Sequence, residues 1–208
     1  MERGSTKQEI LKAALDLFSV QGYEATSVSQ IADAVGIRKA TMYSHYAGKQ
    51  EILDALIQTT LEQYRKHSVF VQANWEDPSF QKEKQNFTSD QAWQIISGQI
   101  RYILHDPLIY KSRKMLTIEQ FRTPELKALQ TQQNYTNVMH YFTGLIAFLI
   151  RQGKLAGNDA EVLAAQLCLP ISVWINLCDR EPEREEEIMH LIERHVRQFF
   201  QTNGVGSL

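Results

Sequence analysis

Apolar residues recur along the whole chain at spacings of three and four positions, which is the period of an amphipathic helix. Alternating runs of β-branched residues, which are typical of strands, are nearly absent. The pattern therefore predicts an all-α protein of about nine helices. We expect the helices to begin near residues 6, 27, 38, 48, 88, 107, 124, 158 and 182.

Three helix starts show the spacing of a capping box. In this motif a cap side chain and a Glu or Gln three positions later each pair with the other residue's backbone N–H. Such a motif fixes where a helix begins, so these three starts are predicted with a physical reason. The pairs are Thr6 with Glu9, Ser27 with Gln30, and Asn158 with Glu161.

Glycine and proline mark the other boundaries. We expect Gly22 to end the first helix in a left-handed conformation and Gly36 to form the turn before a short third helix. Pro107, Pro124 and Pro182 suit the first position of a helix, whereas Pro170 should kink one. A fourth helix should run from residue 48 to about residue 70 or beyond, followed by a polar loop over residues 74–89.

The stretch 27–46 has the order of parts that a helix-turn-helix needs: a supporting helix, a glycine turn, and a second short helix with small and polar residues. The net charge of the chain is only −2. Between residues 38 and 49, however, Arg38, Lys39 and Lys49 occur without any acid. This local basic cluster is typical of a DNA-binding face. On spacing alone, a helical hairpin with a solvated polar face remains an alternative.

Hydroxyls at the start of the second helix and polar side chains on the third are candidate DNA contacts. Hydroxyls and free backbone N–H groups at a helix N-terminus can bind a phosphate, and a small residue lets a helix approach the groove closely. The candidates are Thr26, Ser27, Ser29, Arg38, Lys39, Ala40, Thr41, Tyr43, Ser44, His45 and Lys49.

This N-terminal region closely resembles the TetR family of bacterial transcriptional regulators. The resemblance covers about the first quarter of the chain, and as a set its residues are highly specific. They are Ile10, Leu11, Ala13, Ala14, Leu17, Phe18, Gly22, Thr26, Val28, Ile31, Ala32, Gly36, Thr41, Tyr43, His45, Tyr46, Lys49 and Leu53.

The resemblance implies particular roles on DNA. Tyr43, His45 and Lys49 would hold phosphates, while the third helix would face the major groove through Lys39, Ala40, Thr41 and Ser44. Arg38 departs from the family, which often has a capping serine there. The departure removes a side-chain cap, typically ~1 kcal/mol, and adds a cation at the groove.

Two domains are expected: residues 1–48 as the DNA-binding domain and residues 49–208 as an effector-binding and dimerisation domain, bridged by the fourth helix. A dimer on a near-palindromic operator of double-stranded DNA is expected, because one helix-turn-helix contacts few base pairs. The last two helices carry the apolar faces for pairing, although a monomer that covers its own core is the alternative. The interface candidates are Leu167, Trp174, Ile188, Leu191, Ile192, His195, Val196 and Phe199.

Aromatic residues are frequent between the fourth and eighth helices, and the resemblance implies a pocket there for a small-molecule effector. The sequence does not separate pocket aromatics from core aromatics. The candidates with a polar group are Trp93, Tyr102, Tyr110, Tyr135, His140, Tyr141 and Trp174.

Other classes of function lack support in the sequence. The six histidines form no HExxH or similar ligand spacing, and no glycine-rich phosphate loop or G-x-S-x-G motif occurs, so we expect no enzyme, no metal and no cofactor. Cys168 and Cys178 are ten residues apart on one helix and cannot pair; free thiols in a reducing cytosol are expected, with a redox sensor as the alternative. No apolar run reaches the roughly 18 residues of a membrane span.

These patterns predict a cytoplasmic, homodimeric and ligand-responsive regulator of transcription, most simply a repressor that an effector releases from its operator. The alternative is an all-helical module that binds a ligand or a protein and no longer reads DNA. The basic cluster over residues 38–49 favours the first hypothesis, since a protein that does not read DNA has no need of it.

Overall fold

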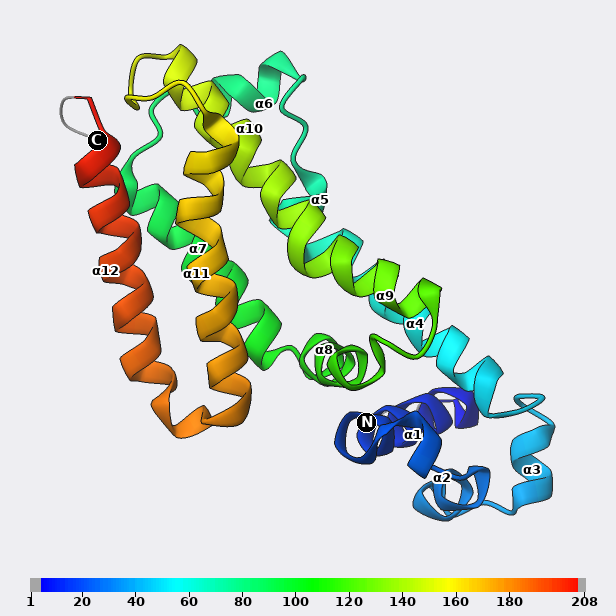
Figure 1. Ribbon diagram of the computed structural model, residues 1–208. Coiled ribbons are helices and arrows are strands. Elements are labelled where there is room, and N and C mark those ends of the chain that lie inside the picture. The colour runs from blue at the N-terminus through cyan, green and yellow to red at the C-terminus, as the bar shows by residue number, and fades with distance from the viewer. Residues whose placement is uncertain (1–4, 206–208) are drawn as a thin grey trace. The chain divides into compact units, whose positions relative to one another are not determined.

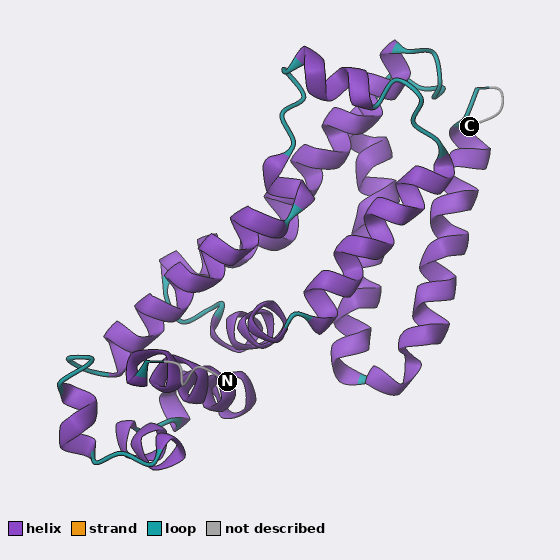
Figure 2. Ribbon diagram, turned by 180° about the vertical axis from the view of Figure 1, so that it is seen from behind, coloured by secondary structure: helices purple, strands orange, loops and turns teal. Residues whose placement is uncertain are grey.

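The computed structural model describes residues 5–205 and confirms the all-α class; Figure 2 shows helices and loops throughout this part of the chain. The helices are α1 (Thr6–Ala25), α2 (Val28–Val35), α3 (Lys39–Tyr43), α4 (Lys49–His67), α5 (Val69–Gln72), α6 (Pro78–Glu83), α7 (Ser89–His105), α8 (Pro107–Glu119), α9 (Pro124–Thr131), the π-helix η1 (Gln132–Thr136), α10 (Asn137–Arg151), α11 (Ala160–Arg180), the 3₁₀-helix η2 (Pro182–Arg184) and α12 (Glu185–Asn203).

The chain forms two compact units, and each is described by itself (Figure 1). Unit 1 contains the residues up to Lys66 together with Asp106–Gln130, and unit 2 contains His67–His105 together with the residues from Thr131 onward. Unit 1 therefore holds α1 to α3, nearly all of α4, and α8 and α9. The long helix α4 belongs to the same unit as the helix-turn-helix, so these elements form one packed body.

Unit 1 has its own apolar core. Ile10, Phe18, Ile31, Met42 and Ile52 come from four successive helices and are at most 1% exposed. Met115 and Leu116 of α8 join the same cluster. Each helix turns one apolar stripe inward, as its spacing predicts, and the polar face of α3 is left outside.

Unit 2 is built around α7, α10, α11 and α12. Its core contains Ile100, Leu145, Leu149, Leu167 and Val196 with other buried apolar residues of these helices. Figures 1 and 2 both show α11 and α12 side by side, joined by the short turn at η2. Among the described residues, α11 is the one helix long and apolar enough to cross a membrane. It packs against α10, α7 and α12 as part of the core.

Two predicted helix caps are wrong by one residue. Helix α1 starts from Ser5, which forms the capping box with Gln8, in place of Thr6 and Glu9. Helix α11 starts from Asp159, whose carboxylate accepts from the Val162 N–H at 3.0 Å, in place of Asn158. In both places a neighbouring side chain of similar capping ability takes the position.

The predicted middle region differs in three ways, which together account for the three additional α-helices. The fourth helix stops at His67, and Ser68 separates it from the short α5. The expected loop contains a short helix, α6, whose first turn is capped by the Asp77 carboxylate. The expected seventh helix is divided into α9 and α10 by the π-helix η1. Helix α11 continues through Pro170.

Candidate nucleic-acid interface

The α2–turn–α3 segment is held by local interactions that the sequence predicts. Ser27 Oγ accepts from the Gln30 N–H at 3.2 Å, and Gln30 Oε1 accepts from the Ser27 N–H at 2.7 Å, so the predicted capping box is present. Gly36 adopts the left-handed conformation (φ 77°, ψ 29°) that the turn requires. Met42, 1% exposed, anchors α3 in the core of unit 1. The segment is therefore a rigid platform.

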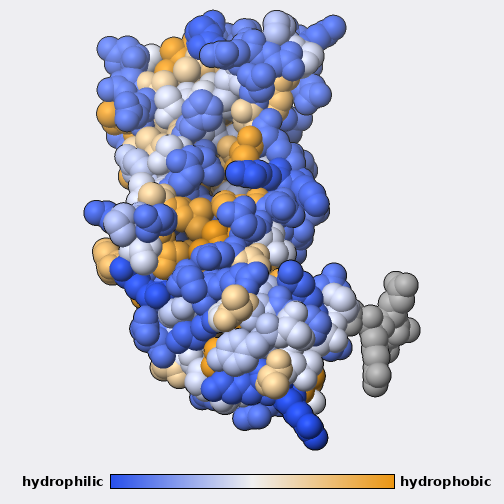
Figure 3. All heavy atoms as spheres, turned by 90° about the vertical axis from the view of Figure 1, so that its right-hand side faces the viewer, coloured by the Kyte–Doolittle hydropathy of each residue, from blue (hydrophilic) through white to orange (hydrophobic). Residues whose placement is uncertain are grey.

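The side of α3 opposite to Met42 is open to solvent. Lys39, Ala40, Thr41, Tyr43 and Ser44 are all exposed, and the face over α3 in Figure 3 is mainly hydrophilic. A five-residue helix anchored by one buried methionine thus presents four candidate contacts, and its C-cap residue Ser44 adds a fifth. An exposed lysine, a small alanine and two hydroxyls are suited to base edges and thymine methyl groups in a major groove.

Arg38 is the N-cap residue of α3 and makes no side-chain cap hydrogen bond, as its departure from serine predicts. Its side chain is exposed beside Lys39. At the start of α2, Ser29 is exposed, and the Ser27 hydroxyl accepts from the backbone with its own proton still free to donate. His45 follows α3 and is partly exposed.

Thr26 corrects the prediction. The side chain is 1% exposed, its hydroxyl donates to the Gly22 carbonyl at 2.7 Å, and it accepts from Gln21 Nε2 at 3.0 Å. Because both functions of the hydroxyl are used inside unit 1, Thr26 connects α1 to α2 and is not placed to contact DNA.

Lys49 is also occupied within the protein. Its ammonium donates to the carbonyl oxygens of Tyr23 at 2.6 Å and Thr26 at 2.7 Å, with that of Glu24 at 3.4 Å. It also lies 4.1 Å from the centre of the Tyr23 ring. An ammonium has three protons, and three carbonyls face it here. In this arrangement Lys49 ties α4 to the α1–α2 connection instead of reaching outward to a phosphate.

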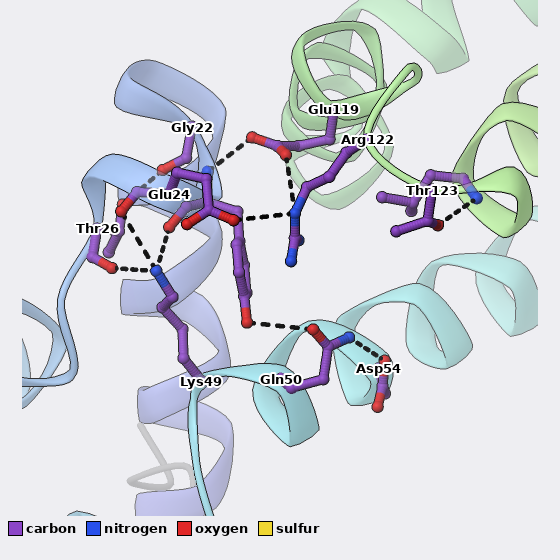
Figure 4. A network of polar contacts seen from close by, with 11 residues as sticks. Gly22, Glu24, Thr26, Lys49, Gln50, Asp54, Glu119, Arg122 and Thr123 are labelled. Carbon is purple, nitrogen blue, oxygen red and sulfur yellow. Dashed lines mark hydrogen bonds and ion pairs between the residues drawn. The ribbon is translucent and has the colours of Figure 1, made fainter.

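A polar network around Tyr23 joins α8 to the same connection, and sequence reasoning missed it (Figure 4). Gly22 leaves helical geometry (φ 82°, ψ 167°), and the Tyr23 N–H donates to Glu119 Oε1 at 2.8 Å. Arg122 pairs with Glu24 at 3.1 Å and lies 3.9 Å from the Tyr23 ring centre. Figure 4 shows Lys49 of α4 and Arg122, which follows α8, in one network with Glu24 and Glu119.

One sequence signal could have revealed this network. Glu119 continues the buried stripe of Met115 and Leu116 on α8, and a carboxylate on such a stripe requires a buried partner. That partner, the Tyr23 N–H, lies 96 residues away and became available only because Gly22 interrupts α1.

The predicted effector-pocket residues are not brought together as one set. Tyr110 belongs to unit 1, whereas the other six belong to unit 2. Tyr135 and His140 are exposed, Trp93, Tyr102 and Trp174 are half-buried, and Tyr141 is buried among Phe70, Trp75 and Phe142. Trp174 lies edge-on to His195 of α12, with ring centres 5.2 Å apart.

The predicted interface on α11 and α12 also needs correction. Five of the eight residues are buried in unit 2's own core and cannot contact a partner without unfolding: Leu167, Ile188, Ile192, Val196 and Phe199. His195 donates from Nε2 to the Leu167 carbonyl at 2.9 Å. Of the predicted residues, Leu191 on α12 is exposed, and α11 also exposes Val162 and Val173, which the prediction did not include.

Comparisons with known proteins agree with this geometry. Residues 10–56 match the model of the family described as bacterial regulatory proteins, tetR family. The transcriptional regulator SrpR of Pseudomonas putida is 27% identical over 88% of this chain and 89% of its own length. The regulator TcmR of Streptomyces glaucescens is 45% identical over 47 residues, which span 23% of this chain and 21% of TcmR.

Solved structures share the fold over nearly the whole chain. A TetR-family transcriptional regulator from Mesorhizobium loti has a TM-score of 0.65 at 18% identity, covering 96% of this chain and 97% of that one. SmeT, the repressor of the Stenotrophomonas maltophilia multidrug efflux pump SmeDEF, has a TM-score of 0.63 at 15% identity, with 96% and 91% covered.

A helix-turn-helix with an exposed polar recognition face, followed by a large helical unit, defines a class of DNA-binding regulators rather than enzymes. Within that class, residues 10–56 form a helix-turn-helix region of the tetR family of bacterial regulatory proteins.

Proposed function

We propose that this protein is a cytoplasmic, homodimeric repressor that binds a near-palindromic operator through α3 and leaves it when a small molecule binds in unit 2. One observation carries the DNA-binding part. The exposed residues of α3 form a polar and basic face on a helix that Met42 anchors in the core, and the Ser27–Gln30 capping box fixes the start of the supporting helix α2. A rigid helix that presents unpaired donors is suited to direct readout of a major groove.

The C-terminal side supports pairing of two copies. Helix α11 is apolar, yet only 28% of its most apolar window is buried within the chain. Val173 is 63% exposed and Leu191 is 39% exposed on the neighbouring helix. Such faces are normally covered, and a second copy would cover them while setting two α3 helices on one duplex.

A salt titration of DNA binding tests the proposal. The purified protein should bind its own upstream region more tightly than random DNA of equal length, and both affinities should fall steeply as salt rises, because contacts to phosphates release counterions. At a fixed salt concentration the preference for upstream DNA should remain. Equal affinity for both duplexes at every salt concentration would favour the alternative, a helical binding module that does not read DNA.

A further inference from the structure

Two buried polar side chains lie near the place in unit 2 where α4 ends and α5 begins. Ser68 interrupts the helix in an extended conformation (φ −84°, ψ 118°) and is 0% exposed. Gln99 of α7 is 5% exposed, and its Oε1 accepts from the Val69 N–H at 3.3 Å. The helix break therefore lies directly against the Gln99 carboxamide.

Both side chains have unused hydrogen-bonding capacity within the described part of the chain. Ser68 Oγ and Gln99 Nε2 are buried and have no hydrogen-bond partner. The amide orientation is fixed, because a flipped Gln99 would set its NH₂ group against the Val69 N–H donor. Buried polar groups are nearly always paired in native proteins, so each unpaired one calls for a bound partner.

Aromatic residues follow this helix break along the chain and pack together. Phe70 follows Val69, and its ring centre lies 5.3 Å from that of Tyr141 and 5.6 Å from that of Phe142. Trp75 also contacts Tyr141, at 5.7 Å, and its Nε1 is a further buried atom without a partner. An indole N–H and an amide NH₂ can only donate, so the missing partner must be an acceptor.

The side chains named above favour an uncharged partner. Ser68, Gln99, Phe70, Tyr141 and Phe142 carry no charge, and burial raises the pKa of Tyr141 to about 12, which keeps its hydroxyl neutral. Burying a full charge in such a site would cost far more free energy than burying a neutral carbonyl group whose oxygen is hydrogen-bonded.

We propose that Ser68 and Gln99 form the polar end of the effector site, and that the effector is a neutral aromatic molecule bearing a carbonyl group. The carbonyl oxygen accepts from Gln99 Nε2 and Ser68 Oγ, and the aromatic part packs against Phe70 and Tyr141. This inference rests on the proposed function, because it names the chemistry of the effector. Ser68 adjoins the end of α4, the helix that begins next to α3.

Calorimetric titration with two matched probes tests the chemistry. Benzophenone has a carbonyl between two rings, and diphenylmethane has a methylene in the same place. We expect the wild-type chain to bind benzophenone roughly tenfold more tightly, the size expected from hydrogen bonds to groups otherwise left unpaired. Ser68→Ala and Gln99→Met should each reduce the ratio toward one by weakening benzophenone alone. The anion 2-benzoylbenzoate should bind more weakly than benzophenone.

A ratio near one in the wild type, a ratio unchanged in both variants, or no binding of either probe overturns the proposal. A control on the free protein separates an effector site from a permanently bound water. Ser68→Ala should leave the melting temperature unchanged or raise it, because the hydroxyl it removes is unpaired. Thr60→Ala should lower it, since the Thr60 hydroxyl is paired with Leu56 O and Ser112 Oγ, both at 2.8 Å. A fall as large in Ser68→Ala would indicate a structural water and overturn the proposal.

Operator binding is measured separately, so the two proposals can fail independently. Carbonyl-dependent binding of benzophenone without any change in operator affinity would support the site and contradict release by an effector. Carbonyl-dependent binding by a protein that does not distinguish its upstream DNA from random DNA would also support the site and contradict the repressor function.

Discussion

At the residue scale, exposure and pairing separate the side chains that can meet DNA from those that build the platform. Lys39 is exposed on α3, whereas the Lys49 ammonium donates hydrogen bonds to backbone carbonyl oxygens. Two lysines ten positions apart in one basic cluster therefore have different roles. A reading by charge alone treats them as equivalent, and the structure shows why they are not.

Lys39 should determine sequence preference. Lys39→Ala removes an exposed donor on α3 and should weaken operator binding by about 1–3 kcal/mol while affecting random DNA far less, because base contacts carry the sequence information. Competition binding at constant salt measures the difference. Lys82→Ala, an exposed lysine of α6 in unit 2, is the matched control and should change neither affinity. A uniform loss for both DNAs in Lys39→Ala would make Lys39 a phosphate contact instead.

Tyr141 should make stability sensitive to alkaline pH. Burial raises its pKa from the ordinary 10.0 to about 12, so the unfolded chain loses this proton first and deprotonation favours unfolding. The stabilising effect is complete below pH 10 and should be lost between about pH 10 and 12, at about 1.4 kcal/mol per pH unit. Urea unfolding at pH 9 and 11 should show a smaller decline for Tyr141→Phe than for wild type. Tyr135→Phe, at a 48% exposed position, should decline as wild type does.

At the element scale, the end of α1 is the junction on which the helix-turn-helix depends. Gly22 can adopt its positive φ, and a Cβ there would lie 3.1 Å from Glu119 Oε1 and 3.3 Å from Ile118. The break in α1 frees the Tyr23 N–H, and α8 supplies the acceptor. Helix α8 is thus part of the DNA-binding body, although it begins at Pro107, 82 residues after α1 ends at Ala25 and 64 residues after α3 ends at Tyr43.

Removing that acceptor should loosen unit 1. Glu119→Leu leaves the Tyr23 N–H buried and unpaired, which costs about 1–3 kcal/mol, and should weaken binding to every DNA sequence alike. Glu119→Gln keeps an oxygen acceptor and loses only the 3.9 Å contact with Arg122, so it should remain close to wild type. Thermal unfolding and filter binding measure both effects. Equal losses in the two variants would show that the charge of Glu119, not its hydrogen bond, is what matters.

Local signals made the helix starts and the helix-turn-helix predictable, and long-range contacts decided the rest. Ser27 with Gln30 and Gly36 act within a few residues, so the sequence alone identifies them. The break at Ser68 could not be predicted, because apolar spacing continues from α4 into Val69 and Phe70 and the contact with Gln99 at the break is a tertiary one. Thr26 was assigned to DNA as a hydroxyl at a helix start and Lys49 as part of the basic cluster, but neither local pattern reveals the backbone partners of these side chains in α1.

At the scale of the whole molecule, the apolar residues of α11 and α12 form two surfaces, one buried and one exposed. One side of each helix is buried in unit 2, as Leu167 and Val196 show, and the other exposes Val173 and Leu191. The sequence predicted apolar faces for pairing on both helices but did not distinguish the inner face from the outer one. Phe199, at 7% exposed, belongs to the inner face.

Dimerisation should therefore depend on the outer residues. Val173→Glu combined with Leu191→Glu places two charges on the exposed face, where burial against a partner would be costly, and should give folded monomers in sedimentation experiments. Val20→Glu, at an 81% exposed position in unit 1, is the matched control and should remain dimeric. Phe199→Glu should lower the melting temperature instead, because it puts a charge in the core. Monomers should also bind the operator less tightly than dimers do. In a dimer, the second α3 helix binds its half-site intramolecularly once the first is bound, and a monomer lacks this advantage. Dimers that persist in the double variant would place the pairing surface elsewhere.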